Sequence, residues 1–338
     1  MKLEILEKIN DSDYNEIVDD SKKSTFYTSY KFLEFIKENL KIKPSFIVSY
    51  EKSKINGVFP FFIKEGEYGK VINSLPFFGS YGGIISENTK IDKAIITEFN
   101  NYNKKNDVLS SVIIDNPFCK NEKIYSQFFN CTDIENRLIQ SIILNSNSNE
   151  IWNNFEKRTR WSVRKSEKNN VEIIKFEHES EELENFYNLH LESMKKKNGR
   201  PKPKKLFSLL TKNFVNDRDY NIFIAKKDGR SISYILVFYY KNFSEYYLPA
   251  YDPNYLPLQS TSYLIWKSIQ ESIKRKIKFY NFGGTWKTQK ELYLFKRGWN
   301  ATDYNYKYFI FKNSELINSI GLEKILEKYQ YFYISPIN

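Results

Sequence analysis

The sequence predicts an α/β protein made of two lobes, each built on a mixed sheet. Its 338 residues are many for one domain and ordinary for two. Segments with strand and helix patterns alternate along the whole chain, as is typical of α/β folds. The polar run NSNSN at 145–149 is typical of a linker. We therefore expect a first lobe at residues 1–145 and a second at residues 146–338.

The two predicted lobes differ in charge. Residues 1–145 carry 19 basic and 20 acidic side chains, whereas residues 146–338 carry 33 basic and 21 acidic ones. A basic excess in one half favours an anionic partner there, such as a nucleotide, a pyrophosphate, CoA or RNA. A lysine-rich solvated surface is the alternative, and composition alone does not separate the two.

The sequence holds few of the residues that several other kinds of site need. The chain holds two cysteines and two histidines, which are too few for a disulfide framework and argue against a zinc site or a Ser-His-Asp triad. No basic start is followed by the apolar run of a signal peptide, and no apolar run is long enough to span a bilayer. We expect a soluble, cytoplasmic protein without a bound metal.

In the first half, period-two patterns predict strands and helical spacing of apolar residues predicts helices. The expected strands are 3–9, 46–50, 57–63, 70–75, 108–114 and two between 125 and 144, and the expected helices are 11–20, one within 25–40, and 91–103.

Two features of this half are candidate site residues. Asp115 directly follows the strand 108–114, and the C-terminal end of a strand is a usual place for a site residue in an α/β sheet. An aspartate that only caps a turn is an equal alternative. The segment Tyr81-Gly82-Gly83 can turn tightly and expose backbone N–H groups to a ligand, although a plain turn would use the same residues.

The second half shows the same two patterns. The expected helices are 150–168, 181–197, one starting near 205, 259–273 and 321–331, and the expected strands are 171–176, 221–225, 231–240, 244–248, 277–282 and 304–311.

Two arginines of this half are candidate anion contacts. Arg164 lies on a basic face of the helix 150–168, where like charges at helical spacing repel each other unless an anion binds. Arg200 is the only arginine in the stretch 193–216, which has eight lysines and arginines in all and no acidic residue. Its planar guanidinium suits phosphate better than lysine does. A solvated basic surface is the alternative for both.

The stretch 279–299, FYNFGGTWKTQKELYLFKRGW, organises the second half. An apolar strand reaches Gly283-Gly284, where the backbone can come close to a ligand. A polar turn from Thr285 and a short helix that carries Lys296 follow.

This stretch resembles the C-terminal signature of FemAB-like transferases, the two-lobed branch of the GNAT acyltransferase superfamily. The segments NGVFPFFI…SLPFFGSYGGI and KRTRWSVRKSEKNNVEI are also similar to that family. The resemblance implies two tandem GNAT-like lobes with a cleft between them. It also implies transfer of an acyl or aminoacyl group to an amine of a cell-envelope precursor.

The same resemblance implies roles for individual residues. Lys296 is the main catalytic candidate, because the lysine of this motif is thought to stabilise charge on the acyl carbonyl or on the leaving end of the donor. Its structural alternative is a basic residue near a helix C-terminus, favourable by a few tenths of a kcal/mol. Asp115 would orient or deprotonate the amine. The expected substrate contacts are Arg200, Arg164 and Tyr247, which would bind the acceptor, and Tyr81, Gly82, Gly83, Gly283, Gly284 and Thr285.

The donor is predicted from a motif of CoA-dependent enzymes that this sequence lacks. CoA-dependent GNAT enzymes usually carry Arg/Gln-x-x-Gly-x-Gly/Ala before the helix that follows their fourth strand, where backbone N–H groups hold the pyrophosphate. Here that position reads AYDPNYLPLQSTS, without glycine or arginine. We therefore expect aminoacyl-tRNA as the donor substrate and no permanently bound cofactor, with acyl-CoA as the alternative.

The expected acceptor is an anionic nucleotide- or lipid-linked envelope precursor, with peripheral contact to the inner membrane surface. The enzymatic alternative is an acyl-CoA-dependent N-acyltransferase that acts on an amino-sugar nucleotide. The alternative from another class is a non-catalytic protein that binds RNA or a membrane surface through its basic half.

Overall fold

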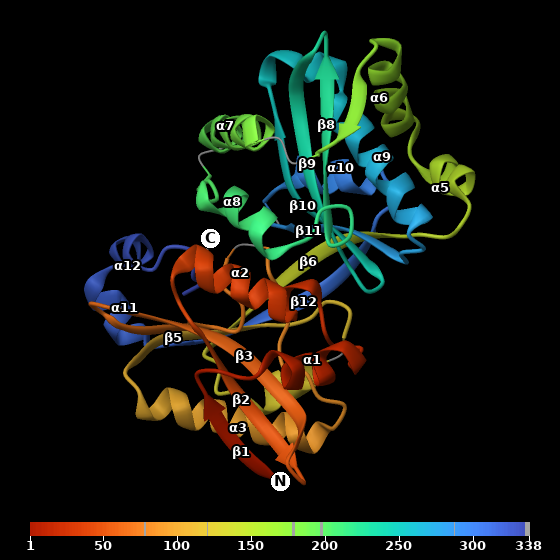
Figure 1. The fold of residues 1–338 in the computed structure, drawn as a ribbon. Helices are drawn as coiled ribbons and strands as arrows, with labels where there is room; N and C mark the ends of the chain where they lie inside the picture. Colours follow the sequence, from red (N-terminus) through yellow and green to blue (C-terminus); the bar gives the residue numbers. More distant parts are fainter. Residues whose placement is uncertain (78, 120, 178–179, 197–198, 287, 335–338) are drawn as a thin grey trace. The chain divides into compact units, whose positions relative to one another are not determined.

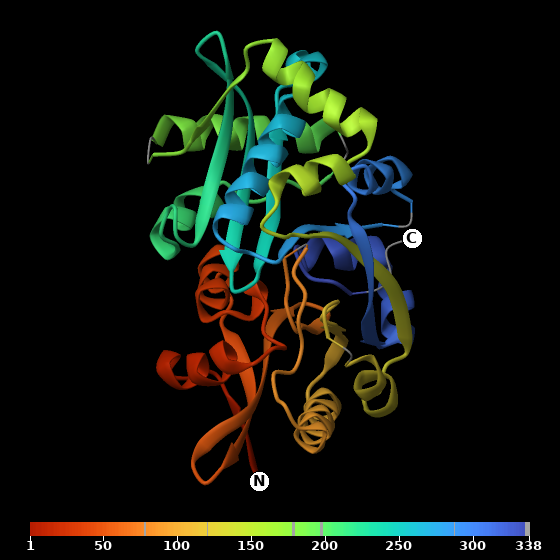
Figure 2. The same ribbon diagram turned by 90° about the vertical axis from the view of Figure 1, so that its right-hand side faces the viewer.

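The computed structural model describes residues 1–334 except 78, 120, 178–179, 197–198 and 287. The chain divides into two compact units. Unit 1 comprises Met1–Leu138 and Asn305–Asn338, and unit 2 comprises Ile139–Tyr304. Figures 1 and 2 show each unit as a sheet flanked by helices.

The sheet of unit 1 is mixed, with one parallel pair flanked by antiparallel pairs. Its strands are β1 (Lys2–Leu6), β2 (Pro44–Glu51), β3 (Lys54–Gly66), β4 (Gly69–Asn73), β5 (Val108–Ile114), the start of β6 (Asp133–Ile143) and most of β12 (Thr302–Lys312). Their order is β1-β2-β3-β4-β5-β12-β6. β4 is parallel to β5, whereas β12 is antiparallel to β5, with Tyr308 opposite Ile114.

Helices cover both faces of this sheet. They are α1 (Asp11–Asp20), the 3-10 turn η1 (Phe26–Thr28), α2 (Tyr30–Leu40), α3 (Thr89–Lys105), α4 (Glu122–Phe128), α11 (Ser314–Ile320) and α12 (Leu322–Lys328). On one face, Phe99 of α3 packs against Phe59 and Phe61 of β3, with ring centroids 5.1 and 5.5 Å apart. On the other face, Tyr14 of α1 packs against Phe46 of β2 at 5.6 Å.

The sheet of unit 2 has the order β6-β11-β10-β9-β8-β7. Besides the end of β6, its strands are β7 (Glu172–Lys175), β8 (Tyr220–Lys227), β9 (Arg230–Tyr240), β10 (Phe243–Tyr251) and β11 (Phe279–Thr285). β7 to β10 are antiparallel, and β11 is parallel to β10. The helices are α5 (Ser148–Asn154), α6 (Lys157–Lys168), α7 (Ser180–Lys196), α8 (Lys205–Asn213), the 3-10 helix η2 (Pro253–Leu258), α9 (Ser260–Lys274) and α10 (Lys290–Arg297).

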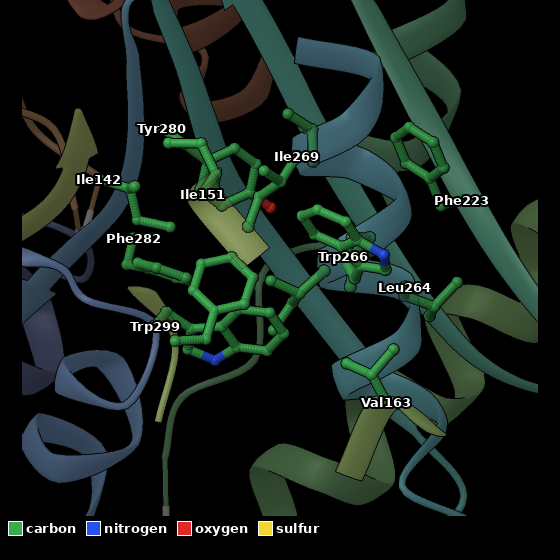
Figure 3. Close-up of a cluster of buried hydrophobic side chains, with 14 of the residues drawn as sticks. Ile142, Ile151, Val163, Phe223, Leu264, Trp266, Ile269, Tyr280, Phe282 and Trp299 are labelled. Atoms are coloured by element: carbon green, nitrogen blue, oxygen red, sulfur yellow. The ribbon is translucent and has the colours of Figure 1, made fainter. Parts of the chain in front are cut away.

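Alternate residues of β9 serve the two faces of this sheet. Ile235 and Val237 share a core cluster with Ile265 and Ile269 of α9, and Figure 3 shows part of that cluster. On the opposite face, Tyr234 stacks on Phe186 of α7 with ring centroids 5.0 Å apart.

The same core joins the two halves of the 279–299 stretch. Phe282 in the middle of β11 and Trp299 after α10 are both buried, with ring centroids 6.2 Å apart, and Figure 3 shows them side by side. Apolar packing therefore fixes the position of α10, which carries Lys296.

The predicted division of the chain needs a correction at its C-terminal end. The second lobe was expected to run to residue 338, but residues 305–338 belong to unit 1. β12 pairs with β5, and Phe309 lies in the core of unit 1. Tyr329 also donates a hydrogen bond of 2.8 Å from its hydroxyl to the Gly69 carbonyl. Pairing between strands far apart in sequence therefore overrides chain order here.

Two element predictions also need correction. The helix expected at 150–168 is broken between α5 and α6, because Phe155 adopts an extended backbone and buries its ring against Trp266 and Trp299. The region 125–144 was expected to hold two strands, but α4 extends into it and only β6 is a strand there.

Over the part of the chain that the structure describes, no helix is long and apolar enough to cross a membrane.

Candidate functional site

Lys296 is a buried lysine surrounded by three oxygen acceptors. It lies on the last turn of α10 and is 3% exposed. Its Nζ donates to the carbonyls of Gly283 and Gly284 and to the Thr285 hydroxyl, at 2.9 Å in each case. A protonated amine has three N–H donors, so the three acceptors match an ammonium group. The structure thus brings together four of the residues that the sequence analysis named.

Two opposing effects act on the pKa of Lys296. Burial lowers this pKa to about 7, because a charged group loses its hydration inside the protein. The three hydrogen bonds favour the protonated form, because each accepts from the charged amine. The lysine is therefore a cation that can lose its proton near neutral pH.

A chain of buried polar groups holds the glycine turn that accepts from Lys296. The backbone N–H of Gly283 donates to Asn281 Oδ1 at 2.9 Å, and Asn281 Nδ2 donates to Glu245 Oε2 at 2.7 Å. Asn281 and Glu245 are both buried and face each other across β11 and β10. Gly283 has φ +71°, a left-handed conformation that glycine adopts without strain.

A second series of hydrogen bonds holds the Thr285 side of the turn. The Thr285 hydroxyl donates to Gln140 Oε1 at 3.2 Å, which leaves its oxygen free to accept from Lys296. Gln140 Nε2 in turn donates to the Tyr293 carbonyl on α10 at 3.3 Å. Sequence reasoning missed Gln140, Asn281 and Glu245. Their signal was weak, because a single polar residue within an apolar strand does not reveal its partner.

Asp115 is a buried carboxyl group in unit 1. Burial raises its pKa to about 7, and the hydrogen bond that Oδ1 accepts from the Asn116 backbone N–H at 2.8 Å partly offsets this rise. The nearby carboxylate of Glu122 raises the pKa further, whereas Lys23 and Lys307 lower it. A carboxyl group with a pKa near 7 can act as a general base or acid at neutral pH.

The segment Tyr81-Gly82-Gly83 lies next to Asp115. The Gly82 backbone N–H donates to the Ile114 carbonyl at 3.0 Å, which places the segment beside the end of β5. Gly82 has φ +141°, and a Cβ on Gly83 would clash with the Tyr125 hydroxyl. The N–H of Gly82 is therefore used within the protein, whereas these glycines still allow close packing beside Asp115.

Arg200 and Tyr247 lie in another part of unit 2. Arg200 is exposed and forms no hydrogen bond or ion pair with the described residues. The Tyr247 hydroxyl is buried without a hydrogen-bond partner among those residues. Lys202, which the sequence analysis did not single out, places its Nζ 4.9 Å from the centre of the Tyr247 ring. Burial lowers the pKa of Lys202 to about 7.

Arg164 is exposed on α6 and lies over the Trp152 ring, 5.5 Å from its centre. It is away from the Tyr247 strand, on the α5–α6 side of unit 2, so the structure does not bring all the predicted acceptor contacts together.

The segment before α9 carries a buried carboxyl group at the place where CoA-dependent GNAT domains usually hold a pyrophosphate. The buried Asp252 occupies it, and its Oδ1 accepts from the Asn254 N–H at 3.0 Å. The Tyr255 N–H donates to the Asp252 carbonyl at 3.1 Å, and the Ser262 N–H to the Gln259 carbonyl at 3.0 Å. Three backbone N–H groups of this segment are therefore used within the chain, and a carboxylate there repels anions, although Arg230 pairs with it at 2.9 Å.

Comparison with known proteins places this geometry in a fold family. Residues 153–308 match the acetyltransferase (GNAT) domain family. No curated protein matches the sequence.

Three solved structures share the fold. FemX superposes with a TM-score of 0.72 at 14% identity, covering 95% of this chain and 100% of that one. The C-terminal domain of a putative lysylphosphatidylglycerol synthetase from Agrobacterium fabrum gives a TM-score of 0.59 at 10% identity, covering 96% and 99%. A tandem GNAT protein from the clavulanic acid biosynthesis pathway gives a TM-score of 0.51 at 6% identity, covering 92% and 100%. The predicted α/β fold with two tandem GNAT-like lobes is thereby confirmed.

Proposed function

We propose that this chain, whose residues 153–308 match the acetyltransferase (GNAT) domain family, is an acyltransferase that transfers an aminoacyl group from tRNA to an amine of an anionic cell-envelope precursor. The observation that carries the proposal is the buried Lys296 with its three acceptors in the Gly283-Gly284-Thr285 turn. A buried cation beside a solvent-exposed glycine is suited to stabilise negative charge that develops on a bound carbonyl.

The proposed reaction is aminolysis of an ester. The nitrogen of a neutral acceptor amine attacks the ester carbonyl, and negative charge develops on the carbonyl oxygen. The bond to the ribose oxygen then breaks, that oxygen takes up a proton, and the amine nitrogen loses one. We assign stabilisation of the developing charge to Lys296 and removal of the amine proton to ionised Asp115.

The acceptor contacts follow from charge and hydrogen bonding. The exposed guanidinium of Arg200 suits a phosphate of a nucleotide- or lipid-linked precursor. The buried Tyr247 hydroxyl, which has no hydrogen-bond partner among the described residues, would pair with a polar group of the same acceptor. In unit 1, the Tyr81-Gly82-Gly83 segment would contact substrate beside Asp115. The names of the structural neighbours, FemX and a lysylphosphatidylglycerol synthetase, agree with aminoacyl transfer to an envelope component.

The choice of donor rests on Asp252. Its carboxylate and the used N–H groups before α9 disfavour a pyrophosphate at the place where CoA-dependent GNAT domains usually hold one. We therefore favour charged tRNA and propose a cytoplasmic location, with peripheral contact to the membrane when the acceptor is lipid-linked. The family match to an acetyltransferase domain favours the second candidate, an acyl-CoA-dependent N-acyltransferase acting on an amino-sugar nucleotide.

The test is a transfer assay with purified protein, a pool of radiolabelled aminoacyl-tRNAs and, in parallel, labelled acetyl-CoA, each with amine-bearing nucleotide-linked and lipid-linked precursors. We expect label to move from tRNA and not from acetyl-CoA. Lys296→Met should lower the rate by roughly 10²–10³-fold, the usual loss for one electrostatic stabiliser, with an unchanged circular dichroism spectrum. Label from acetyl-CoA alone would establish the second candidate. Full turnover by Lys296→Met would overturn the catalytic assignment.

A further inference from the structure

Helix α6 presents an unusually basic surface to solvent. Five of the six basic side chains on this helix make no hydrogen bond to the end of α5. Together with Trp161 they form what we term the α6 basic face: Lys157, Arg158, Trp161, Arg164, Lys165 and Lys168. Glu167 is the only acidic residue on the helix. None of the five basic residues forms an ion pair within the described ranges. Their mutual repulsion is therefore not relieved within the described structure.

Packing fixes which side of α6 faces outward. Ser162, Val163 and Ser166 are buried, and Val163 joins the core cluster that contains α9. Arg160, the remaining basic residue of α6, donates from Nη1 to the carbonyls of Asn153 and Phe155 at the end of α5. The outward basic face is thus separate from the residues that hold the helix in place.

Trp161 indicates whether the α6 basic face suits a membrane surface or a nucleic acid. Trp161 is 55% exposed, and it is the only large apolar residue exposed on α6. The Lys165 ammonium lies 4.9 Å from the centre of a Trp161 ring. A helix that inserts into a membrane surface needs a wide apolar face, which α6 does not offer to solvent. A single exposed aromatic ring among cations is instead typical of proteins that stack on unpaired bases and pair with phosphates.

The α6 basic face begins beside the turn that follows Lys296. The Glu156 N–H donates to the Gly298 carbonyl at 2.9 Å. A Cβ on Gly298 would lie 2.7 Å from Thr159 Oγ1, so α10 and α6 meet too closely there for a side chain. From that point α6 extends about 18 Å, at 1.5 Å per residue over its 12 residues. A polyanion that lies along α6 therefore has one end close to the segment that carries Lys296.

We propose that the α6 basic face binds the tRNA, with the five cations on its phosphates and Trp161 stacked on an unpaired base near its acylated end. Identifying the RNA as the acyl donor rests on the proposed function, whereas the RNA-binding surface rests on the charge, exposure and position of these six residues. Arg164 thereby becomes a donor contact, in place of the acceptor contact that the sequence analysis expected.

The experiment measures binding of fluorescently labelled bulk tRNA to the full chain over a series of salt concentrations. The test variant carries Lys157→Gln, Arg158→Gln, Arg164→Gln and Lys168→Gln. The control variant removes the same charge from exposed lysines elsewhere, by Lys104→Gln, Lys105→Gln, Lys274→Gln and Lys276→Gln. We expect the test variant to lower the slope of log K against log salt by roughly 3 and to weaken binding by at least about tenfold at moderate salt, since each lost phosphate contact removes about one released counterion. The control should match wild type in slope and affinity.

A second measurement isolates the stacking contact. tRNA should quench tryptophan fluorescence of the wild type, and Trp161→Leu should lose most of that quenching and bind several-fold more weakly, in line with about 1–3 kcal/mol for a stacked base. Equal losses in the test and control variants would mean non-specific attraction and would overturn the proposal. So would unchanged tRNA binding in the test variant, or a loss confined to binding of phosphatidylglycerol vesicles.

Failure of this inference and failure of the proposed function give different results. If the test variant binds tRNA normally while wild type transfers the aminoacyl group, the surface is wrong and the function stands. If wild type transfers nothing but tRNA binding depends on the α6 basic face, the surface stands and the function is wrong. Lys296→Met serves as the reference for a defect in chemistry, because it leaves the α6 basic face intact.

Discussion

At the scale of single residues, the two proposed catalytic groups both have pKa values near 7, for the same reason and with opposite consequences. Burial raises the pKa of the Asp115 carboxyl and lowers that of the Lys296 amine, because in each case it disfavours the charged form. Near neutral pH both groups are close to half-ionised. Such groups are suited to proton transfer and to charge stabilisation.

The Asp115 carboxyl should make stability fall as pH rises. Its folded-state pKa of about 7 lies above the ordinary value of 3.8, so its contribution is fully present below pH 3.8 and is lost as pH rises through about 7. Asp115→Asn removes this titration and keeps the acceptor for the Asn116 N–H. We expect the difference in Tm, variant minus wild type, to grow more positive between pH about 4 and about 8. A difference that stays constant across this range would show that Asp115 does not titrate as its burial implies.

The Lys296 amine should act in the opposite direction. Its folded-state pKa of about 7 lies below the ordinary 10.5. Its contribution to the free energy of unfolding is therefore fully present above pH 10.5 and is lost as pH falls through about 7. We expect the difference in Tm, Lys296→Met minus wild type, to be more positive at pH about 6.5 than at pH about 9.5. Thermal denaturation at the two pH values measures this. If the two differences in Tm are equal, the hydrogen bonds to the glycine turn outweigh burial and the amine keeps an ordinary pKa.

At the scale of elements, β11 does more than carry its glycines to the site. Its Asn281 links the Gly283 N–H to the Glu245 carboxylate, so one buried amide sets the geometry of the turn that accepts from Lys296. Hydrogen bonding between strands and burial both restrict this side chain to a single arrangement. The turn is therefore positioned by its own strand and by the neighbouring β10.

Asn281→Ala should loosen the turn. The Gly283 N–H and the Glu245 carboxylate each lose the partner described here, and we expect a loss of about 1–3 kcal/mol in the free energy of unfolding. Turnover should also fall, with a shift in its pH dependence, because the acceptors around Lys296 move.

Asn221→Ala is the matched control for this prediction. Asn221 is also a buried strand asparagine of unit 2, and it donates to Asp217 at 3.0 Å, away from the glycine turn. Its loss should lower stability by a comparable amount, with a wild-type pH profile of turnover. If both variants change turnover equally, Asn281 has only a structural role. Urea denaturation and initial rates over pH give both readouts.

The break between α5 and α6 is a second element-scale result. The pattern at 150–168 reads as one helix, because Trp152, Phe155 and Val163 lie at helical spacing. The structure instead buries Phe155 between Trp266 and Trp299 in an extended conformation. Core packing outweighs local helix propensity here, since burying an aromatic ring stabilises by more than the few tenths of a kcal/mol that separate most helix propensities.

At the scale of the whole molecule, the sequence order of the segments is not their spatial order. Residues 305–338 complete unit 1, where β12 pairs with β5 and Asn73 Nδ2 donates to the Tyr333 carbonyl at 2.9 Å. Ending the chain after Tyr304 should therefore unfold unit 1 while unit 2 keeps its core. Hydrogen exchange should show loss of protection in β4 and β5 and retained protection in β8 and β9. Retained protection in β5 would show that unit 1 folds without β12.

A good part of the fold and of the candidate site could be predicted from the sequence. Apolar periodicity and turn residues predicted most strands and helices, because those signals are local. The FGGT and FKRGW motifs singled out Lys296, Gly283, Gly284 and Thr285, and the structure brings these four residues together. Asp115 and the Tyr81-Gly82-Gly83 segment were also named, and they lie side by side in unit 1.

What the sequence by itself determined was the α/β class, from its local patterns. Through the motifs that resemble FemAB-like transferases, it also determined the tandem GNAT-like architecture and the residues of the glycine turn with its lysine. Only the tertiary structure decided that residues 305–338 belong to unit 1, that Asn281, Glu245 and Gln140 hold the turn, and that Asp252 occupies the segment before α9. Each of these depends on a partner far away in sequence. The free energy of burying polar groups selects such partners in three dimensions, and a one-dimensional pattern does not record them.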